Sequence, residues 1–135
     1  MSRSGKPRAS RPDGRQCAML IVRLLDEKQQ DLSGNREVTR ARLSEITIQR
    51  LFNRRRISPE FLADVQEWLF RVGWILFFAG TTYAVVKMKV VEGWGRISSK
   101  RIRLDLERVA TGEFDFDSLE HLLLVEPESS IEHDD

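Results

Sequence analysis

The chain has 135 residues, of which 41% are hydrophobic and 32% charged, a composition that is normal for a folded soluble domain with tails. Cys17 is the only cysteine, which excludes an internal disulfide framework and leads us to expect a reducing compartment. The net charge of +1 hides a gradient: residues 1–56 carry 14 Lys and Arg against 6 Asp and Glu, residues 57–111 carry 8 against 6, and residues 112–135 carry none against 9. This asymmetry is typical of a polyanion-binding front with an acidic tail, although solvation of both ends also explains it.

Residues 72–86 contain no charged side chain, which raises the question of a membrane span. A spanning helix needs about 20 apolar residues, and this shorter run includes two glycines and two threonines. A β-hairpin in the core of the domain is therefore the better interpretation. The Arg-rich start leads into no separate apolar segment with a cleavage site, so we expect no signal peptide, no membrane contact and a cytoplasmic location.

The first elements in the chain are an arm and a helix. Residues 1–14 are rich in Arg, Ser, Gly and Pro and are expected to form a disordered basic arm. Asp13 is placed to cap a helix over residues 15–32 with one apolar face. Met19 and Val22 lie off that face and are candidates for a dimer contact, although isolated exposed apolar residues are common.

A second helix, capped by Thr39 or Ser44, is expected to end near Arg54. The triplet Arg54, Arg55 and Arg56 follows at the turn into the next helix. Side chains at this position of a helix-turn-helix straddle a DNA backbone. Arginines at a helix C-terminus also interact favourably with the helix dipole, so a structural role explains part of the cluster equally well.

Ser58 followed by Pro59 predicts the start of a third helix, which Gly73 ends. Its outer face carries an acidic stripe formed by Glu60, Asp64 and Glu67. Acidic groups repel phosphates, and their one good partner on a base edge is the cytosine amine. Contacts with DNA are therefore expected from the flanks of this helix, with Ser58 and Gln66 nearest the bases.

Residues 74–78 and 83–90 have the aromatic and β-branched composition of two strands, and the Ala-Gly-Thr-Thr turn at residues 79–82 joins them. Alternation places Lys87 and Lys89 on one face of the second strand. That arrangement is expected of a wing that rests on phosphate. Lysines also protect edge strands from aggregation, which is an equally good explanation.

Trp94 lies between two glycines and beside Arg96, an arrangement that suits an exposed wedge, although such a tryptophan more often folds back onto the core. Ser98 or Ser99 then caps a predicted fourth helix over residues 100–110, with Ile102, Leu106 and Val109 facing inward. Four cations near its start form a second candidate DNA-binding group: Arg96, Lys100, Arg101 and Arg103. Cations at a helix N-terminus oppose the dipole, and an anionic partner is one explanation for them.

Residues 112–135 interleave bulky apolar side chains with acidic ones and are expected to form an acidic helix and tail. The segment either closes the domain, covers its basic face, or docks as an amphipathic helix into a protein partner. No Gly-rich phosphate loop or zinc-spaced Cys/His set occurs, and no nucleophile has a recognisable base. We therefore expect no enzymatic activity, no cofactor and no metal.

The order helix, arginine turn, helix, strand, turn, strand from Leu43 to Val86 resembles the winged helix-turn-helix superfamily, and small bacterial transcriptional regulators in particular. The resemblance implies an α+β fold over residues 15–111, with a three-helix core, a β-hairpin and additional C-terminal helices. It also implies binding of double-stranded DNA, commonly as a homodimer through the first or last helix. The residues expected to contact DNA are Arg54, Arg55, Arg56, Ser58, Gln66, Lys87, Lys89, Arg96, Lys100, Arg101 and Arg103. The alternative is a winged-helix protein-interaction module that meets a basic partner through the acidic stripe.

Overall fold

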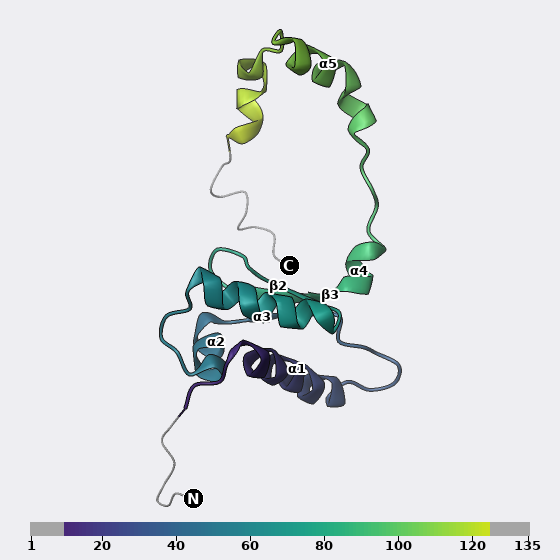
Figure 1. Ribbon diagram of the computed structural model, residues 1–135. Coiled ribbons are helices and arrows are strands. Elements are labelled where there is room, and N and C mark those ends of the chain that lie inside the picture. Colours follow the sequence, from purple (N-terminus) through teal and green to yellow (C-terminus); the bar gives the residue numbers. More distant parts are fainter. Residues whose placement is uncertain (1–9, 125–135) are drawn as a thin grey trace, which may run out of the picture. The chain divides into compact units, whose positions relative to one another are not determined.

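The computed structural model describes residues 10–124 and shows an α+β protein that contains several helices and a three-stranded antiparallel sheet (Figure 1). Two compact units divide between Trp94 and Gly95. The first unit contains α1 (Gly14–Gln30), β1 (Arg40–Leu43), α2 (Glu45–Phe52), α3 (Pro59–Arg71), β2 (Trp74–Phe78), β3 (Tyr83–Lys87) and α4 (Met88–Glu92). The second contains the 3-10 helices η1 (Ser99–Ile102) and η2 (Phe116–Leu123), with α5 (Arg103–Thr111) between them. Most of the predicted basic arm and the end of the acidic tail lie outside the described residues.

Two of the predicted helix starts are confirmed with their caps. The Asp13 carboxylate accepts a hydrogen bond of 2.8 Å from the Gln16 amide, and the Gln16 side chain accepts one of 3.0 Å from the Asp13 amide. This reciprocal pair satisfies two amides that the first turn of α1 leaves free. Ser58 caps α3 in the same way, since its hydroxyl accepts from the Phe61 amide at 3.1 Å, and Pro59 occupies the first turn.

The second helix, α2, begins at Glu45, which agrees with only one of the two predicted caps. Residues 40–43 form strand β1, so the prediction of Thr39 as a cap is wrong and Ser44 is the cap, its hydroxyl accepting from the Thr47 amide at 3.1 Å. The Thr39 carbonyl instead accepts from the Lys87 amide at 2.8 Å, which continues the ladder between β1 and β3. The reason is long-range: pairing along β3 satisfies the backbone of residues 40–43 and buries Leu43.

The predicted hairpin is present, and β3 lies in the middle of the sheet with the order β1-β3-β2. Because residues 72–86 contain two strands and a turn, they do not form one continuous helix. Among residues 10–124, no helix combines the length and the apolarity that crossing a membrane requires. β3 ends at Lys87 and the next residues form α4, so the prediction of a strand through Val90 with two lysines on one face is wrong.

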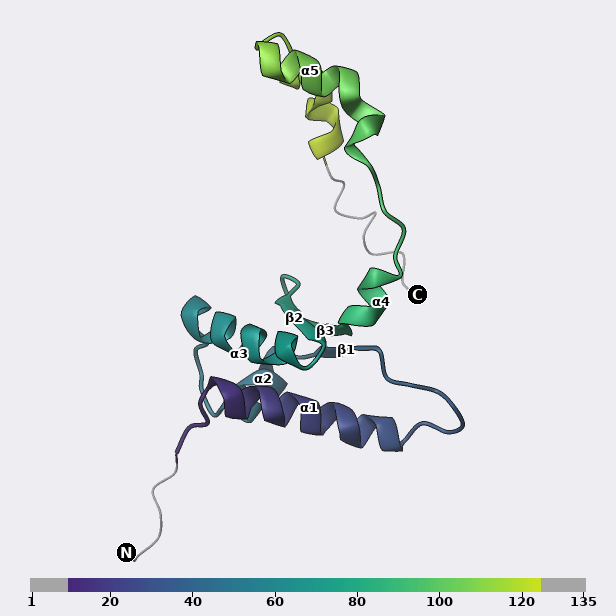
Figure 2. The same ribbon diagram turned by 45° about the vertical axis from the view of Figure 1, so that its right-hand side comes forward.

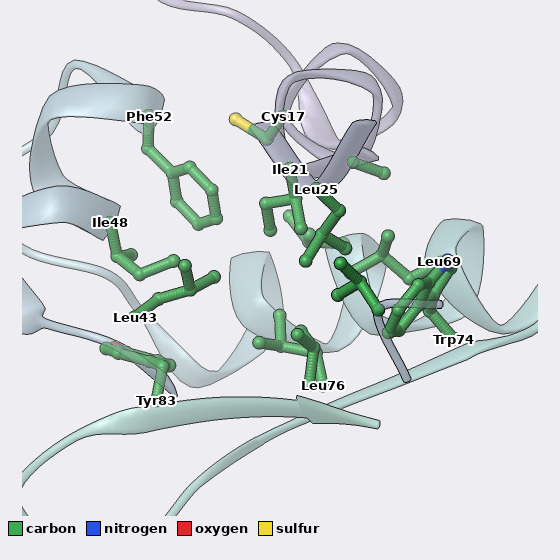
Figure 3. Close-up of a cluster of buried hydrophobic side chains, with 14 residues drawn as sticks. Cys17, Ile21, Leu25, Leu43, Ile48, Phe52, Leu69, Trp74, Leu76 and Tyr83 are labelled. Carbon is green, nitrogen blue, oxygen red and sulfur yellow. The ribbon is translucent and has the colours of Figure 1, made fainter. Parts of the chain in front are cut away.

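One buried apolar cluster connects the elements of the first unit. α3 packs against both α1 and β2 (Figures 1 and 2). Figure 3 shows side chains from α1, α2, α3 and all three strands that converge on one region. Its largest fully buried members are Phe52, Ile21, Ile48, Leu69 and Val65. The short helix α2 therefore contributes two of the most deeply buried side chains in the unit.

The second unit has a different character, because no side chain among residues 95–124 is buried. The hydroxyl of Ser98 caps the first turn by accepting from the Lys100 amide at 3.1 Å, and α5 begins only at Arg103. Ile102, Leu106 and Val109 are 50%, 43% and 40% exposed, so the predicted inward face is wrong. Helices this short and this few bury little apolar surface within the unit.

Trp94 does not fold back onto the core. Its side chain is 57% exposed, and its backbone amide donates to the Val91 carbonyl at 3.0 Å. α4 follows β3 directly, packs against it and is capped at its C-terminus by Gly93. Trp94 lies just beyond α4 and is exposed, so the interpretation of this residue as a lid is wrong.

Replacement of Phe52 by Ala is expected to lower the free energy of unfolding by about 3–5 kcal/mol, because it removes a fully buried ring and leaves a cavity. Phe70→Ala is the matched control, because Phe70 is also in a helix but is 57% exposed. Its replacement should lower the free energy of unfolding by less than about 1 kcal/mol. Urea denaturation followed by circular dichroism measures both values. Equal losses in the two variants would contradict the position of the core.

Candidate nucleic-acid interface

The arginine triplet lies at a sharp reversal of the chain between α2 and α3. Asn53 caps the C-terminus of α2 with a φ of 54°, in the left-handed region, and the Arg54 amide donates to the Gln49 carbonyl at 3.1 Å. A left-handed residue at the end of a helix satisfies its last carbonyls and turns the chain away. Only a few residues separate this reversal from Ser58, so the triplet is held between two helix ends.

The three arginines are not equivalent. Nη1 of Arg54 donates to the Pro12 carbonyl at 2.7 Å and to the Phe52 carbonyl at 3.1 Å, and the guanidinium carbon lies 3.8 Å from the centre of the Phe61 ring. This half-buried cation therefore connects the segment before α1 with the turn between α2 and α3. Arg55 and Arg56 are exposed and available to a ligand.

Beside this turn the surface is hollowed into a groove of about 660 Å³, which we call the arginine groove. Its lining residues are Arg11, Glu45, Gln49, Arg54, Arg55, Arg56, Ile57, Ser58, Pro59, Phe61 and Tyr83. A second hollow of about 380 Å³ shares Gln49, Arg54 and Arg55 and adds Arg50 to the basic surface. Glu45 is the one acidic residue among the described residues that line either hollow. The arrangement offers an excess of positive charge to an anion.

Two lining residues are absent from the residues that the sequence predicts to contact DNA. Arg11 was expected in a disordered basic arm that steers the protein to phosphates, and the hydrogen bond from Arg54 to the neighbouring Pro12 brings it to the groove. Tyr83 comes from the start of β3, far along the chain. Burial, with a smaller effect of the Glu45 carboxylate, raises the pKa of Tyr83 above its ordinary value. No local sequence pattern predicts that Arg11 or Tyr83 lies at the groove.

The two residues expected nearest the bases both make intramolecular contacts. The Ser58 hydroxyl accepts the capping bond described above while it lines the arginine groove. Nε2 of Gln66 donates to the Leu76 carbonyl at 2.9 Å and connects α3 to β2. The Gln66 amide is half-buried in this contact, so its donor group is engaged within the protein.

The two lysines of the predicted wing are engaged by one carboxylate. Nζ of Lys87 lies 2.6 Å and Nζ of Lys89 lies 3.1 Å from Oε2 of Glu37. Hydrogen bonds from Lys87 and then Lys89 hold the pKa of Glu37 below its ordinary value. Tyr83 lines the arginine groove, and Lys87 lies four residues further along the same strand, or roughly 13 Å away at the usual rise per residue. The structure therefore brings Lys87 and Lys89 together, but away from the arginine triplet.

The second predicted cation group, Arg96, Lys100, Arg101 and Arg103, belongs to the other compact unit. All four side chains are exposed, and Arg103 pairs with Glu107 at 3.3 Å across one turn of α5. These residues form a basic group of their own around η1.

The acidic stripe of α3 is exposed, as predicted, but part of it has a structural role. Glu67 pairs with Arg71 at 3.4 Å. The Asp64 carboxylate lies so close to Gly14 that a methyl group added there would overlap it. A negative charge beside the first residue of α1 interacts favourably with the positive end of the helix dipole. This contact between α3 and α1 was not foreseen from the sequence.

Among residues 10–124, no three His, Cys, Asp or Glu side chains are gathered as metal ligands. No protein-family model matches the chain, and neither a curated protein nor a solved structure matches it significantly. The chemistry of the site therefore has to be inferred from its own residues.

Arg54→Ala is expected to lower the free energy of unfolding by about 1–3 kcal/mol, because it removes the charged donor that the carbonyls of Pro12 and Phe52 share. Arg55→Ala should change the stability by less than about 0.5 kcal/mol, since Arg55 is exposed. Urea unfolding of the two variants tests this difference. An Arg54→Ala variant that is as stable as the wild type would show that the guanidinium does not connect these segments.

The buried thiol of Cys17 should make the free energy of unfolding depend on pH. Burial raises its pKa from 9.0 to about 11, although nearby Arg54 opposes the shift. The unfolded thiol ionises first as the pH rises, so the free energy of unfolding should fall across this window. Cys17→Ala removes the group and should show a flatter dependence in urea unfolding at several alkaline pH values. Parallel curves for the two proteins would contradict the raised pKa.

Proposed function

We propose that the protein is a DNA-binding regulator of transcription with a winged helix-turn-helix. The order of α2, the arginine turn, α3 and the β2–β3 hairpin supports this assignment, with α3 in the position of the recognition helix and the hairpin as the wing. The main support is the arginine groove, where exposed Arg55 and Arg56 gather with Arg11 at the turn before α3.

In this proposal the arginine groove provides backbone contacts rather than base readout. Arg11, Arg50, Arg55 and Arg56 neutralise phosphates, while Arg54 holds the turn in place. The outer face of α3 presents Glu60 and Glu67, which phosphates repel. α3 therefore approaches the duplex with its N-terminal end, and discrimination between sequences is weak.

A double variant, Arg55→Ala with Arg56→Ala, tests the proposal on a duplex of random sequence. Four phosphate contacts should give an affinity that falls by about two decades between 50 and 200 mM salt. Removal of two contacts should reduce the slope of log affinity against log salt by about 2 and weaken binding. Fluorescence anisotropy at several salt concentrations measures both effects.

The matched control removes the same two charges elsewhere: Lys87→Ala with Lys89→Ala. Because Glu37 holds both lysines, this variant should retain most of the wild-type slope. A wild type with no salt dependence, or equal losses in the two double variants, would reject the arginine groove as the DNA site.

The exposed acidic face of α3 favours a second candidate, a protein-interaction module with a basic partner. Glu60→Lys with Glu67→Lys should then abolish capture of the partner, whereas the Arg55 and Arg56 variant should retain it. The same charge reversal should strengthen DNA binding if the first proposal holds, because it removes repulsion beside the phosphates. Loss of partner capture by the Glu60→Lys, Glu67→Lys variant would therefore support the interaction module, whereas a gain in its DNA affinity would support the DNA-binding regulator.

A further inference from the structure

The tip of the β2–β3 hairpin presents aromatic side chains rather than charged ones. Residues 72–86 contain no charged side chain, and Lys87 beyond them is engaged by Glu37. The tip therefore offers no cation to a phosphate. In Figure 2 the turn between β2 and β3 projects beyond the strands as a narrow loop. Phe77 and Phe78 precede this turn and are 43% and 44% exposed, so they supply its large apolar surface.

The two phenylalanines belong to opposite faces of the sheet, because successive side chains alternate along a strand. Trp74 and Leu76 are buried in the core, so Phe78 continues their face of β2. Phe77 lies on the other face. Although the two residues are neighbours in the chain and almost equally exposed, they therefore meet different surroundings.

The ring of Phe78 packs next to the arginine groove. Its centre lies 4.8 Å from the ring centre of Tyr83, the residue directly opposite it in β3, and the two rings are tilted by 56°. Tyr83 lines the arginine groove together with Arg55 and Arg56. A duplex whose phosphate backbone occupies that groove therefore has the Phe78 ring beside it.

Contacts within the hairpin hold this ring in place. The Ala79 amide donates to the Thr82 carbonyl at 2.8 Å and closes the turn. The Thr82 hydroxyl donates to the Leu43 carbonyl at 3.2 Å, which fixes the turn to β1. Packing against the buried Tyr83 restricts the ring of Phe78 itself. An aromatic group that is held before binding loses little conformational entropy when a ligand covers it.

An exposed and fixed phenylalanine beside a phosphate-binding groove suits one kind of contact with a duplex. Apolar wedges such as phenylalanine enter the minor groove and separate two stacked base pairs, which bends the duplex. Stacking of a ring on a base needs no charge on the protein. Pyrimidine–purine steps unstack at the least cost, so a wedge discriminates between sequences without hydrogen bonds to base edges. The acidic outer face of α3 is poorly suited to provide such discrimination.

We propose that Phe78 inserts between two base pairs of a duplex whose backbone lies in the arginine groove, and that it favours flexible pyrimidine–purine steps. This inference rests on the proposed function and deepens it by naming a residue that senses the DNA sequence. Arg55 and Arg56 provide affinity through charge, and Phe78 provides a sequence preference through the cost of unstacking.

Two duplexes of equal length and charge test the step preference. One alternates thymine and adenine, and the other is an adenine tract, which is stiff and harder to unstack. The wild type should bind the alternating duplex roughly tenfold more tightly, as fluorescence anisotropy measures. In the alternating duplex, 2-aminopurine in place of an adenine should become brighter on binding, because the base loses the stacking that quenches it.

Phe78→Ala should abolish both the preference and the rise in 2-aminopurine fluorescence. It removes no charge, so the slope of log affinity against log salt should keep its wild-type value, which also shows that the arginine groove is intact. Phe78→Leu should retain much of the preference, because leucine is also an apolar wedge. Phe77→Ala is the matched control, since it removes an equally exposed ring from the other face, and should behave as wild type.

The outcomes separate the wedge from the proposed function. A wild type that binds neither duplex would reject both. Salt-dependent binding with equal affinity for the two duplexes, or without a rise in 2-aminopurine fluorescence, would reject the wedge and leave the arginine groove as a DNA site. Equal losses in the Phe77→Ala and Phe78→Ala variants would also reject the wedge. If Phe78→Ala binds both duplexes as the wild type does, the ring is left for the apolar surface of a partner protein.

Discussion

The burial of Ile48 and Phe52 is the constraint on which the arrangement of the first unit depends. Both side chains are fully buried, and both come from α2, a helix of eight residues. A helix of this length is marginal in water by itself, so tertiary packing has to hold it. Because the arginine turn follows α2 directly, the same apolar contacts that stabilise the core also determine where the positive charge appears on the surface.

The structure separates charges that stabilise the fold from charges that remain available. Arg54 is bound by two carbonyls and a ring, and the lysines of α4 and β3 share Glu37, so these cations are engaged within the chain. Arg55 and Arg56 are exposed beside Arg54. A net charge of +1 therefore says little about binding of an anion, because the electrostatic potential at the surface depends on which charged side chains have partners within the chain.

The sequence was most informative where the structure is determined by near neighbours. The caps at Asp13 and Ser58 act within three residues, and the hairpin follows from its composition and its glycine turn, so these predictions are confirmed. Strand β1 was missed because only its pairing with β3, some forty residues away, makes it a strand. The site shows the same division: the triplet is a local feature, whereas the approach of Arg11 and the capture of Lys89 by Glu37 depend on tertiary contacts.

The three tryptophans lie in three distinct environments, which gives the protein built-in spectroscopic probes. Trp74 is 8% exposed in the core, Trp68 has two guanidinium groups near its ring, and Trp94 is 57% exposed. An aqueous quencher such as iodide should reach the emission of Trp94 and leave that of Trp74 largely unaffected. Iodide quenching of the intrinsic fluorescence can therefore distinguish changes around Trp94 from changes around Trp74 in the core without an attached label.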